Sequence, residues 1–165
     1  MAERRAAVFL DRDGVINRER GEHTWLMQDF EILPQVAEAF NSIRSAGKLS
    51  IIISNQSGIG LGLCGHAEVE RLHGYLHHEL AEQGAHIDAM YYCPHHPQQG
   101  RCLCRKPGGL LFERAIARYA IDPTRSVMIG DRERDVEAAA SVGVKGILVE
   151  PNASLLDVLR ENRIV

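Results

Sequence analysis

The sequence predicts a doubly wound α/β fold, built on a mostly parallel sheet of five strands. Short apolar runs, several of them rich in β-branched residues, alternate with segments whose apolar residues recur every three or four positions. The apolar runs are nearly continuous rather than alternating, which is typical of strands that are covered by helices on both faces. Polar side chains follow several of these runs, at the strand ends where ligands bind in such folds.

Three strands and two helices are predicted in the first half of the chain. The first helix is indicated by apolar residues at spacings of four and three, with Pro34 suited to its first turn and Gly47 just past its end. Gly84 closes the second helix. The predicted strands are residues 6–10, 49–53 and 87–92, and the helices contain residues 36–43 and 69–80.

Two strands and three helices are predicted in the second half. One helix begins near Gly109 and has Leu111, Ala115 and Tyr119 along one face. The other predicted elements are strands at 126–129 and 144–149 and helices at 132–142 and near 154–161.

The spacing of the elements leaves no room for a large cap domain. Only 36 residues, 18–53, separate Asn17 from Ser54, and they must include a helix and a strand. A length of 165 residues is close to the size of one domain, about 150 residues. We therefore expect a single domain over residues 1–165, with an open site.

Composition excludes several classes of protein. The chain has 19 basic and 22 acidic residues, a formal net charge of −3, whereas proteins that coat nucleic acid are usually basic. No apolar run approaches the roughly 18 residues of a membrane span, and residues 1–5 lack the apolar region of a signal peptide. Four clustered cysteines are too few for a disulfide scaffold in a chain of this length. We expect a cytoplasmic monomer that binds neither a membrane nor nucleic acid.

Two carboxylates directly follow the first predicted strand. Asp11 and Asp13 lie two residues apart, and Gly14 allows the backbone to turn close to a ligand. Bringing two carboxylates together requires a compensating cation, and a hard divalent ion such as Mg²⁺ would supply it. The alternative is a strand end with a simple Asx-type turn.

Three further segments place polar groups at strand ends or helix starts. Residues 54–58, Ser-Asn-Gln-Ser-Gly, offer a hydroxyl and free backbone N–H groups that suit phosphate oxygens, or they form an ordinary polar loop. Lys106 precedes a predicted helix and places a point charge there, or it is a surface lysine. Asp131 and Asp135 add acids after the fourth strand, although Asp131 also suits a helix N-cap.

The motifs Asp11-Arg12-Asp13-Gly14, Ser54, Lys106 and Gly130-Asp131 with Asp135 resemble those of the haloacid dehalogenase-like (HAD-like) phosphohydrolases, which have a Rossmann-like sheet. The resemblance covers nearly the whole chain. It implies that Asp11 is the nucleophile and Asp13 the general acid/base, and that Ser54 and Lys106 hold the phosphoryl group.

The same resemblance implies a Mg²⁺ site formed by Asp11, Asp131 and the backbone carbonyl of Asp13. Asp135 either binds the metal through water or orients Lys106, and the sequence leaves both roles open. The chemistry is consistent with these residues: a cation removes the repulsion between a carboxylate nucleophile and a phosphate dianion. Asp13 must be protonated to assist the leaving oxygen, and it then takes a proton from the water that hydrolyses the aspartyl-phosphate.

A second group of metal-ligand residues occurs in one loop. Three of the four cysteines lie within twelve positions together with two histidines, and a Cys₃His set wraps one tetrahedral Zn²⁺. Scattered free thiols are the alternative. With four protein ligands the zinc would be structural, stiffening a loop that ends at Arg105-Lys106. The expected ligands in this zinc loop, residues 93–107, are Cys93, His95, Cys102 and Cys104, with His96 as the substitute if the register differs.

The residues of the zinc loop narrow the resemblance to two groups of phosphatases. Cys-Pro-His-His-Pro with Cys-x-Cys-Arg-Lys-Pro is similar to the D-glycero-D-manno-heptose 1,7-bisphosphate 7-phosphatases, enzymes that supply heptose for lipopolysaccharide or S-layer glycans. The histidinol-phosphate phosphatases of histidine biosynthesis share this loop. Ser57 and the doubled histidine favour the heptose group, whereas the short spacing from His95 to Cys102 is nearer the histidinol-phosphate form.

The narrower resemblance also implies where substrate binds. A sugar bisphosphate needs a cation away from the metal, for which Arg105, Arg18 and Arg20 are candidates, although Arg18 and Arg20 equally suit a solvated charge cluster. The alternative functions are a phosphatase acting on nucleic-acid ends and a non-catalytic binding module stabilised by zinc. The expected substrate-binding residues are Arg12, Glu19, Arg20, Gly21, Asn55, Gln56, Ser57 and Arg105.

Overall fold

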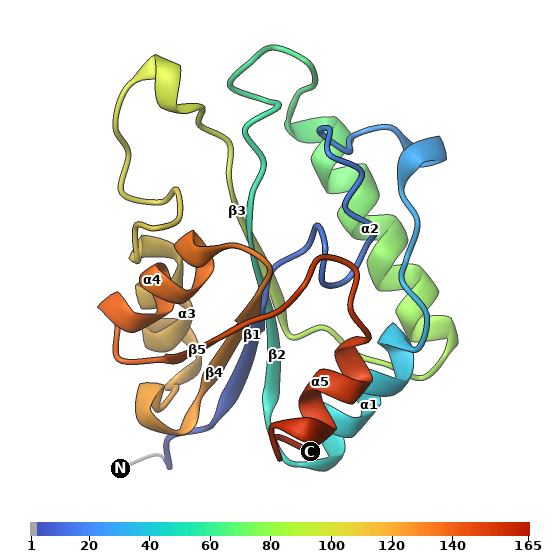
Figure 1. Cartoon of the computed structure of the whole chain (residues 1–165), viewed down its shortest axis with the longest axis vertical. Coiled ribbons are helices and arrows are strands. Elements are labelled where there is room, and N and C mark those ends of the chain that lie inside the picture. The colour runs from blue at the N-terminus through green and yellow to red at the C-terminus, as the bar shows by residue number, and fades with distance from the viewer. Residues whose placement is uncertain (1–2) are drawn as a thin grey trace.

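A parallel five-stranded sheet with helices on both faces forms the centre of the molecule (Figure 1). The computed structural model describes residues 3–165, so residues 1 and 2 of the expected leading segment lie outside it. The strand order is β3-β2-β1-β4-β5, and every neighbouring pair is parallel. The strands are β1 (Ala7–Leu10), β2 (Leu49–Asn55), β3 (Ala89–Cys93), β4 (Val127–Gly130) and β5 (Lys145–Leu148).

Five α-helices cover the two faces of this sheet. One face packs against α1 (Val36–Ser45), α2 (His66–Glu82) and α5 (Leu155–Glu161). The other packs against α3 (Leu110–Tyr119) and α4 (Glu133–Ser141). The predicted fold class and all ten predicted elements are confirmed. Three single-turn 3₁₀ helices were not predicted: Met27–Asp29, Pro97–Gln99 and Pro123–Arg125.

Strand β1 shows why the apolar runs are continuous. Val8 and Leu10 face the core beneath α1, α2 and α5, whereas Ala7 and Phe9 face the core beneath α3 and α4. All four side chains are fully buried, and the Phe9 ring lies 5.0 Å from that of Phe112. Burying a side chain of this kind stabilises the fold by roughly 1.5–3 kcal/mol, so a strand covered on both faces favours an apolar residue at every position.

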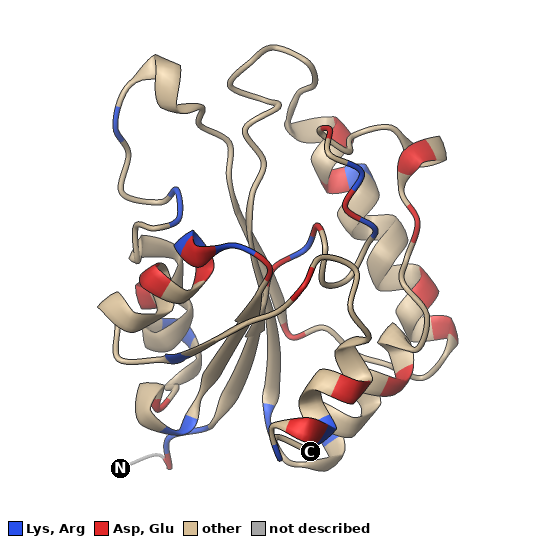
Figure 2. Ribbon diagram, viewed as in Figure 1, with Lys and Arg blue, Asp and Glu red and all other residues tan. Residues whose placement is uncertain are grey.

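The register of the strands brings the polar strand ends to one edge. Leu10 of β1 pairs with Ile52 of β2 and Ile129 of β4, so the residues that follow these strands emerge side by side. Figure 2 shows acidic and basic segments meeting where β1 and β4 end. Within residues 3–165, no segment folds as a separate large cap over this edge. Among the helices described, none combines the length and apolar character needed to cross a bilayer.

Candidate active site

Two strand ends and one helix start bring three buried carboxylates together. Asp11 follows β1, Asp131 follows β4, and Asp135 lies in the first turn of α4; one oxygen of each lies within 4.8 Å of the others. Gly14 has a φ of +86°, and a side chain there would collide with the Asp131 carboxylate. A side chain at Gly130 would collide with Asp135 in the same way. These two glycines leave room for the carboxylates.

Lys106 is the cation that the chain itself supplies to this cluster. Its Nζ lies 2.8 Å from Asp11 Oδ1 and 2.7 Å from Asp135 Oδ1, and it donates a 2.7 Å hydrogen bond to the carbonyl oxygen of Ile53. Burial opposes the charge of Lys106, but the two carboxylates outweigh burial and raise its pKa. Burial is also the largest influence on Asp11, and it raises the pKa of that carboxyl to about 7 although Lys106 acts in the opposite direction.

One lysine does not balance three carboxylates, so the cluster fits a further cation. Asp131 Oδ2 is buried without a hydrogen-bond partner among the described residues, and burial followed by the charge of Asp135 raises the pKa of Asp131. Carboxylate oxygens are the ligands that Mg²⁺ prefers in proteins. The unpartnered oxygen and the excess negative charge therefore match the Mg²⁺ site that the sequence predicts for Asp11 and Asp131, with Asp135 beside them.

The carboxylate of Asp13 is held by three donors rather than by the cluster. Its Oδ1 accepts hydrogen bonds of 2.9 Å from Arg12 Nη2 and from Asn17 Nδ2, and its Oδ2 accepts one of 2.9 Å from Gln56 Nε2. Burial disfavours the charged form of Asp13, but the Arg12 guanidinium and these hydrogen bonds outweigh burial and hold its pKa below the usual range. In the free protein, Asp13 is therefore ionised.

A cleft of about 210 Å³ opens above these groups. Segments that are distant in the sequence form its walls: the strand ends, residues after β1, the loop after β2 and the end of the zinc loop. Most of the predicted site residues meet there. Its lining consists of Asp11, Asp13, Glu19, Gly21, Glu22, His23, Thr24, Asn55, Gln56, Ser57, Arg105, Lys106, Asp131, Arg132 and Arg134.

Some of the residues predicted to bind phosphate or substrate do not line the cleft. Arg12 is fully buried and does not line the cleft, which differs from the direct substrate contact expected of it. Arg20 lies 3.7 Å from Glu22 and 3.4 Å from Asp29, as in a surface charge cluster. Ser54 is fully buried, and its Oγ accepts a 2.7 Å hydrogen bond from Gln56 Nε2, so Gln56 lies between Ser54 and the cleft in this conformation.

Asn55 reaches the cleft but also has a local partner. Its Oδ1 accepts a 3.0 Å hydrogen bond from the backbone N–H of Lys106, and its Nδ2 donates one of 3.2 Å to the Lys106 carbonyl oxygen. The loop after β2 and the end of the zinc loop are thus joined through one amide side chain. This contact fixes the backbone that carries Lys106.

Sequence reasoning missed Arg134, which lies in the first turn of α4 and lines the cleft together with Arg105. Within residues 3–165, neither guanidinium forms an ion pair with a carboxylate. Partial burial and the charge of Arg134 lower the pKa of Arg105. A cation in the first turn of a helix is unfavourable, and that unusual position was the one signal available in the sequence. Arg132, His23 and Thr24 were also missed.

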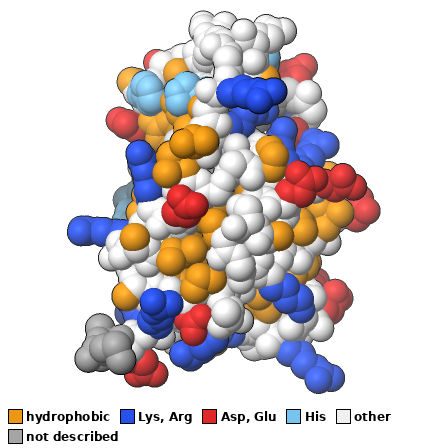
Figure 3. Space-filling model, turned by 90° about the vertical axis from the view of Figure 1, so that its left-hand side faces the viewer, with side chains coloured by type: hydrophobic (Ala, Val, Ile, Leu, Met, Phe, Trp, Pro, Cys, Tyr) orange, Lys and Arg blue, Asp and Glu red, His pale blue; other side chains and the backbone are white. Residues whose placement is uncertain are grey.

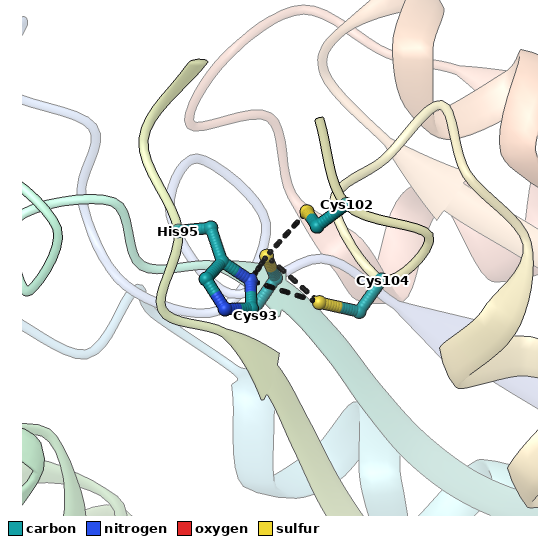
Figure 4. A group of neighbouring side chains, drawn as sticks. All are labelled: Cys93, His95, Cys102 and Cys104. Atoms are coloured by element: carbon teal, nitrogen blue, oxygen red, sulfur yellow. Dashed lines mark hydrogen bonds between the residues drawn. The ribbon is translucent and has the colours of Figure 1, made fainter. Parts of the chain in front are cut away.

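The zinc-loop residues converge as expected (Figure 4). Cys93 Sγ lies 3.7 Å from Cys102 Sγ and 3.2 Å from Cys104 Sγ, and His95 Nδ1 lies 3.4 Å from Cys93 Sγ and 3.2 Å from Cys104 Sγ. A tetrahedral site with Zn–S bonds of about 2.3 Å has S–S edges of about 3.8 Å, close to the separation of Cys93 and Cys102, and a Cys₃His set of donors suits Zn²⁺. The ring of His96 instead accepts a hydrogen bond from the Gln98 N–H.

The chain is similar to known phosphatases along most of its length. A family model described as HAD-hydrolase-like matches residues 103–162. The D-glycero-beta-D-manno-heptose-1,7-bisphosphate 7-phosphatase of Haemophilus ducreyi is 38% identical over 145 residues, covering 84% of this chain and 79% of that protein. The enzyme of the same name from Rhodopseudomonas palustris is 39% identical over 156 residues, covering 90% and 86%.

A solved structure agrees with these relatives. The D,D-heptose 1,7-bisphosphate phosphatase from B. bronchiseptica, complexed with magnesium and phosphate, superimposes with a TM-score of 0.83 at 30% identity, covering 95% of this chain and 86% of that one. The chain therefore belongs to the HAD-like hydrolases, in the family of the heptose-1,7-bisphosphate 7-phosphatases, and is a phosphoric monoester hydrolase.

Proposed function

We propose that the protein is a Mg²⁺-dependent phosphatase that removes the 7-phosphate of D-glycero-D-manno-heptose 1,7-bisphosphate through an aspartyl-phosphate on Asp11. The observation that carries the choice of substrate is the pair Arg105 and Arg134, two guanidinium groups that form no ion pair with a carboxylate of residues 3–165 and that line the cleft containing Asp11. Two like charges in one cleft favour an anionic ligand. A bisphosphate presents one phosphate to Asp11 and a second to the arginines.

Histidinol phosphate fits the same cleft less well. With its phosphate at Asp11, the rest of the molecule carries an ammonium group and an imidazole, and it offers no second anion to the two arginines. The named function of the relatives points to the same substrate, since the enzymes from Haemophilus ducreyi and Rhodopseudomonas palustris both carry the heptose-bisphosphatase name.

The carboxylate cluster supports the proposed metal dependence. Asp11 and Asp131 would hold Mg²⁺ with Asp135 beside them, and the backbone carbonyl of Asp13 is a further expected ligand. When bound, Mg²⁺ supplies a Lewis acid that screens the charges of the carboxylates and the phosphate. The related B. bronchiseptica structure contains both magnesium and phosphate.

The residues of the chain then have separate roles in the reaction. Asp11 attacks phosphorus, Lys106 neutralises charge on the phosphoryl oxygens, and Asp13 donates a proton to the departing sugar oxygen. Asp13 is ionised in the free protein, so the negative charge of bound substrate must raise its pKa before it acts as an acid. In the second step, Asp13 accepts a proton from the water that hydrolyses the aspartyl-phosphate. A role for Ser54 in holding the phosphoryl group requires Gln56 to move aside.

We also propose that the Cys₃His cluster holds a structural Zn²⁺. The cluster directly precedes Arg105 and Lys106, so the metal would fix the backbone that presents both cations. The thiols of Cys93, Cys102 and Cys104 are free of disulfides, which is consistent with a reducing compartment, the cytoplasm.

The test compares kcat/KM for heptose 1,7-bisphosphate, heptose 7-phosphate and histidinol phosphate. We expect the wild-type protein to prefer the bisphosphate. Arg134→Gln should lower kcat/KM for the bisphosphate about 10- to 100-fold and leave that for heptose 7-phosphate nearly unchanged, because one charge-assisted contact is lost. Arg118→Gln, on the exposed surface of α3, is the matched control. A higher kcat/KM for histidinol phosphate would show that the proposed substrate is wrong.

A further inference from the structure

Arg12 is the largest fully buried side chain among the described residues, and it lies between the two aspartates of the first motif. Its Nη2 donates two hydrogen bonds of 2.9 Å, one to Asp13 Oδ1 and one to the carbonyl oxygen of Thr24. Its guanidinium also lies over the ring of Phe30, 5.4 Å from the ring centroid. One buried cation thus contacts both the expected acid and the chain segment that forms a wall of the cleft.

Stability alone does not explain an arginine at this position. Its Nε and Nη1 are buried and have no hydrogen-bond partner among residues 3–165. Burying a charge is costly, and a well-packed apolar side chain in such a place is often as stable or more so. The contacts that Arg12 does make therefore point to its role.

Those contacts join the acid to residues 18–33. Thr24 lines the cleft and is itself buried, and Phe30 packs edge-on against Tyr75 of α2 with ring centroids 6.2 Å apart. The 18–33 segment is consequently fixed to α2 on one side and to Arg12 on the other. Any displacement of this wall would be transmitted through Arg12 to the carboxylate of Asp13.

We propose that Arg12 is a positioning residue that couples the 18–33 segment to the general acid, holding the Asp13 carboxyl toward the leaving oxygen while that segment is docked. The inference rests on the proposed function, because it concerns the same phosphate. In the step involved, Asp11 forms a bond to phosphorus, the bond from phosphorus to the sugar oxygen breaks, and that oxygen takes the proton of Asp13.

The leaving group distinguishes this role from a purely structural one. A sugar alkoxide leaves only with a proton, whereas 4-nitrophenolate is stable without one, so a misplaced acid impairs the first substrate much more than the second. The value of kcat/KM reports only the steps up to departure of the leaving group. The later proton transfer from water, which is common to both substrates, does not contribute to it.

The experiment measures kcat/KM of the full-length wild-type, Arg12→Met and Arg12→Lys proteins on heptose 1,7-bisphosphate and on 4-nitrophenyl phosphate. We expect Arg12→Met to lower the value for the sugar substrate about 100-fold and that for the aryl phosphate less than about threefold. Arg12→Lys, which retains a cation, should recover part of the loss. Glu31→Gln, which breaks the exposed Arg18–Glu31 ion pair of the same segment, is the matched control and should change neither value.

An equal loss on both substrates, or no loss on the sugar substrate, would overturn the proposal. If Arg12→Met does not fold, Phe30→Leu tests the proposal instead. This variant keeps Arg12 but removes the aromatic face through which the 18–33 segment docks on it. Phe30→Leu should show the same selective loss in smaller measure, and an unselective loss would again overturn the proposal. Failure of the proposed function looks different, because the wild-type protein itself would then not prefer the heptose bisphosphate.

Discussion

The two clusters of ligand-type side chains are assembled in opposite ways. The carboxylates Asp11, Asp131 and Asp135 come from both ends of the chain and meet because β1 and β4 are neighbours in the sheet. The Cys₃His ligands come from one loop, within residues 93–104, and meet because that loop folds back on itself (Figure 4). The first cluster depends on the global fold and the second on local chain geometry.

This difference in assembly is matched by a difference in how deeply the two clusters are buried. The carboxylates are buried, and a buried lysine already offsets part of their charge, so the sheet holds them in place with or without a metal. Of the zinc-loop ligands Cys93 is buried, but His95 is exposed and Cys102 and Cys104 are half-buried. Because these ligands are partly exposed, we expect a bound metal to supply much of the rigidity of the loop.

The two regions nevertheless share one boundary. Lys106, the cation of the carboxylate cluster, directly follows Arg105 at the end of the zinc loop. We therefore expect a change in the local cluster to affect the position of a residue in the long-range cluster. Predictions that perturb one cluster at a time separate what each contributes.

Asp11→Asn should have the largest effect, a loss of at least about 10⁴-fold in kcat, because it removes the nucleophile. The fold should persist, since the sheet and not the charge positions this side chain. Phosphate release with excess Mg²⁺ measures the activity. Release equal to that of the wild-type protein would remove Asp11 from the reaction.

The pH dependence of the stability of Asp11→Asn provides a second test that does not depend on activity. The pKa of Asp11 is about 7 in the folded protein and near 3.8 when unfolded, so the folded state holds a proton that the unfolded state has released. Without metal, stability therefore falls as pH rises from about 4 through 7. Asp11→Asn should remove this dependence, which urea unfolding at pH 5 and pH 8 in the presence of chelator would show.

Loss of zinc should have the next largest effect, lowering kcat/KM about 10- to 100-fold through misplacement of Arg105 and Lys106. Cys102→Ser should bind less than one zinc per chain and increase amide exchange within residues 93–107, while β2 remains protected. Metal analysis and hydrogen exchange measure the two changes. Cys64→Ser, at the cysteine outside the cluster, is the matched control. A wild-type protein purified without chelator and free of zinc would contradict the assignment.

The contrast between local and long-range assembly also determines which elements and site residues could be predicted from the sequence. The ten helices and strands follow from local apolar periodicity, and the zinc-loop ligands follow from spacing within twelve positions. Asp11, Lys106 and Asp131 were predicted to share a site because each follows a strand or precedes a helix, and parallel strands end at one edge. Those inferences need only the period of the pattern and the class of the fold.

Contacts that depend on the direction of one side chain were not predictable. Arg12 precedes Asp13 in the sequence, yet its side chain turns into the interior and binds the carbonyl of Thr24. Arg134 reaches the cleft only because α4 begins beside the end of β4 at a particular rotation. Ser54 lies behind Gln56 for the same kind of reason.

The smallest expected effect concerns His73, which lies between the two regions. This buried residue of α2 packs edge-on against Tyr92, next to Cys93, and burial followed by the charge of Arg12 lowers its pKa to about 4. In the unfolded chain His73 takes up a proton near pH 6.5, whereas in the folded protein it does so only near pH 4. Stability therefore falls as pH falls through this window.

His73→Phe retains a ring against Tyr92 but cannot be protonated. We expect the loss of unfolding free energy between pH 7 and pH 4 to be smaller in this variant by up to about 3 kcal/mol. Urea unfolding with chelator present throughout measures it without a contribution from zinc release, and His78→Gln, at an exposed position of the same helix, is the control. If the variant and the wild-type protein lost stability equally, His73 would not be the source of the acid sensitivity. The carboxylates Asp11 and Asp131 could not replace it as the source, because their raised pKa values make stability rise as pH falls through this window.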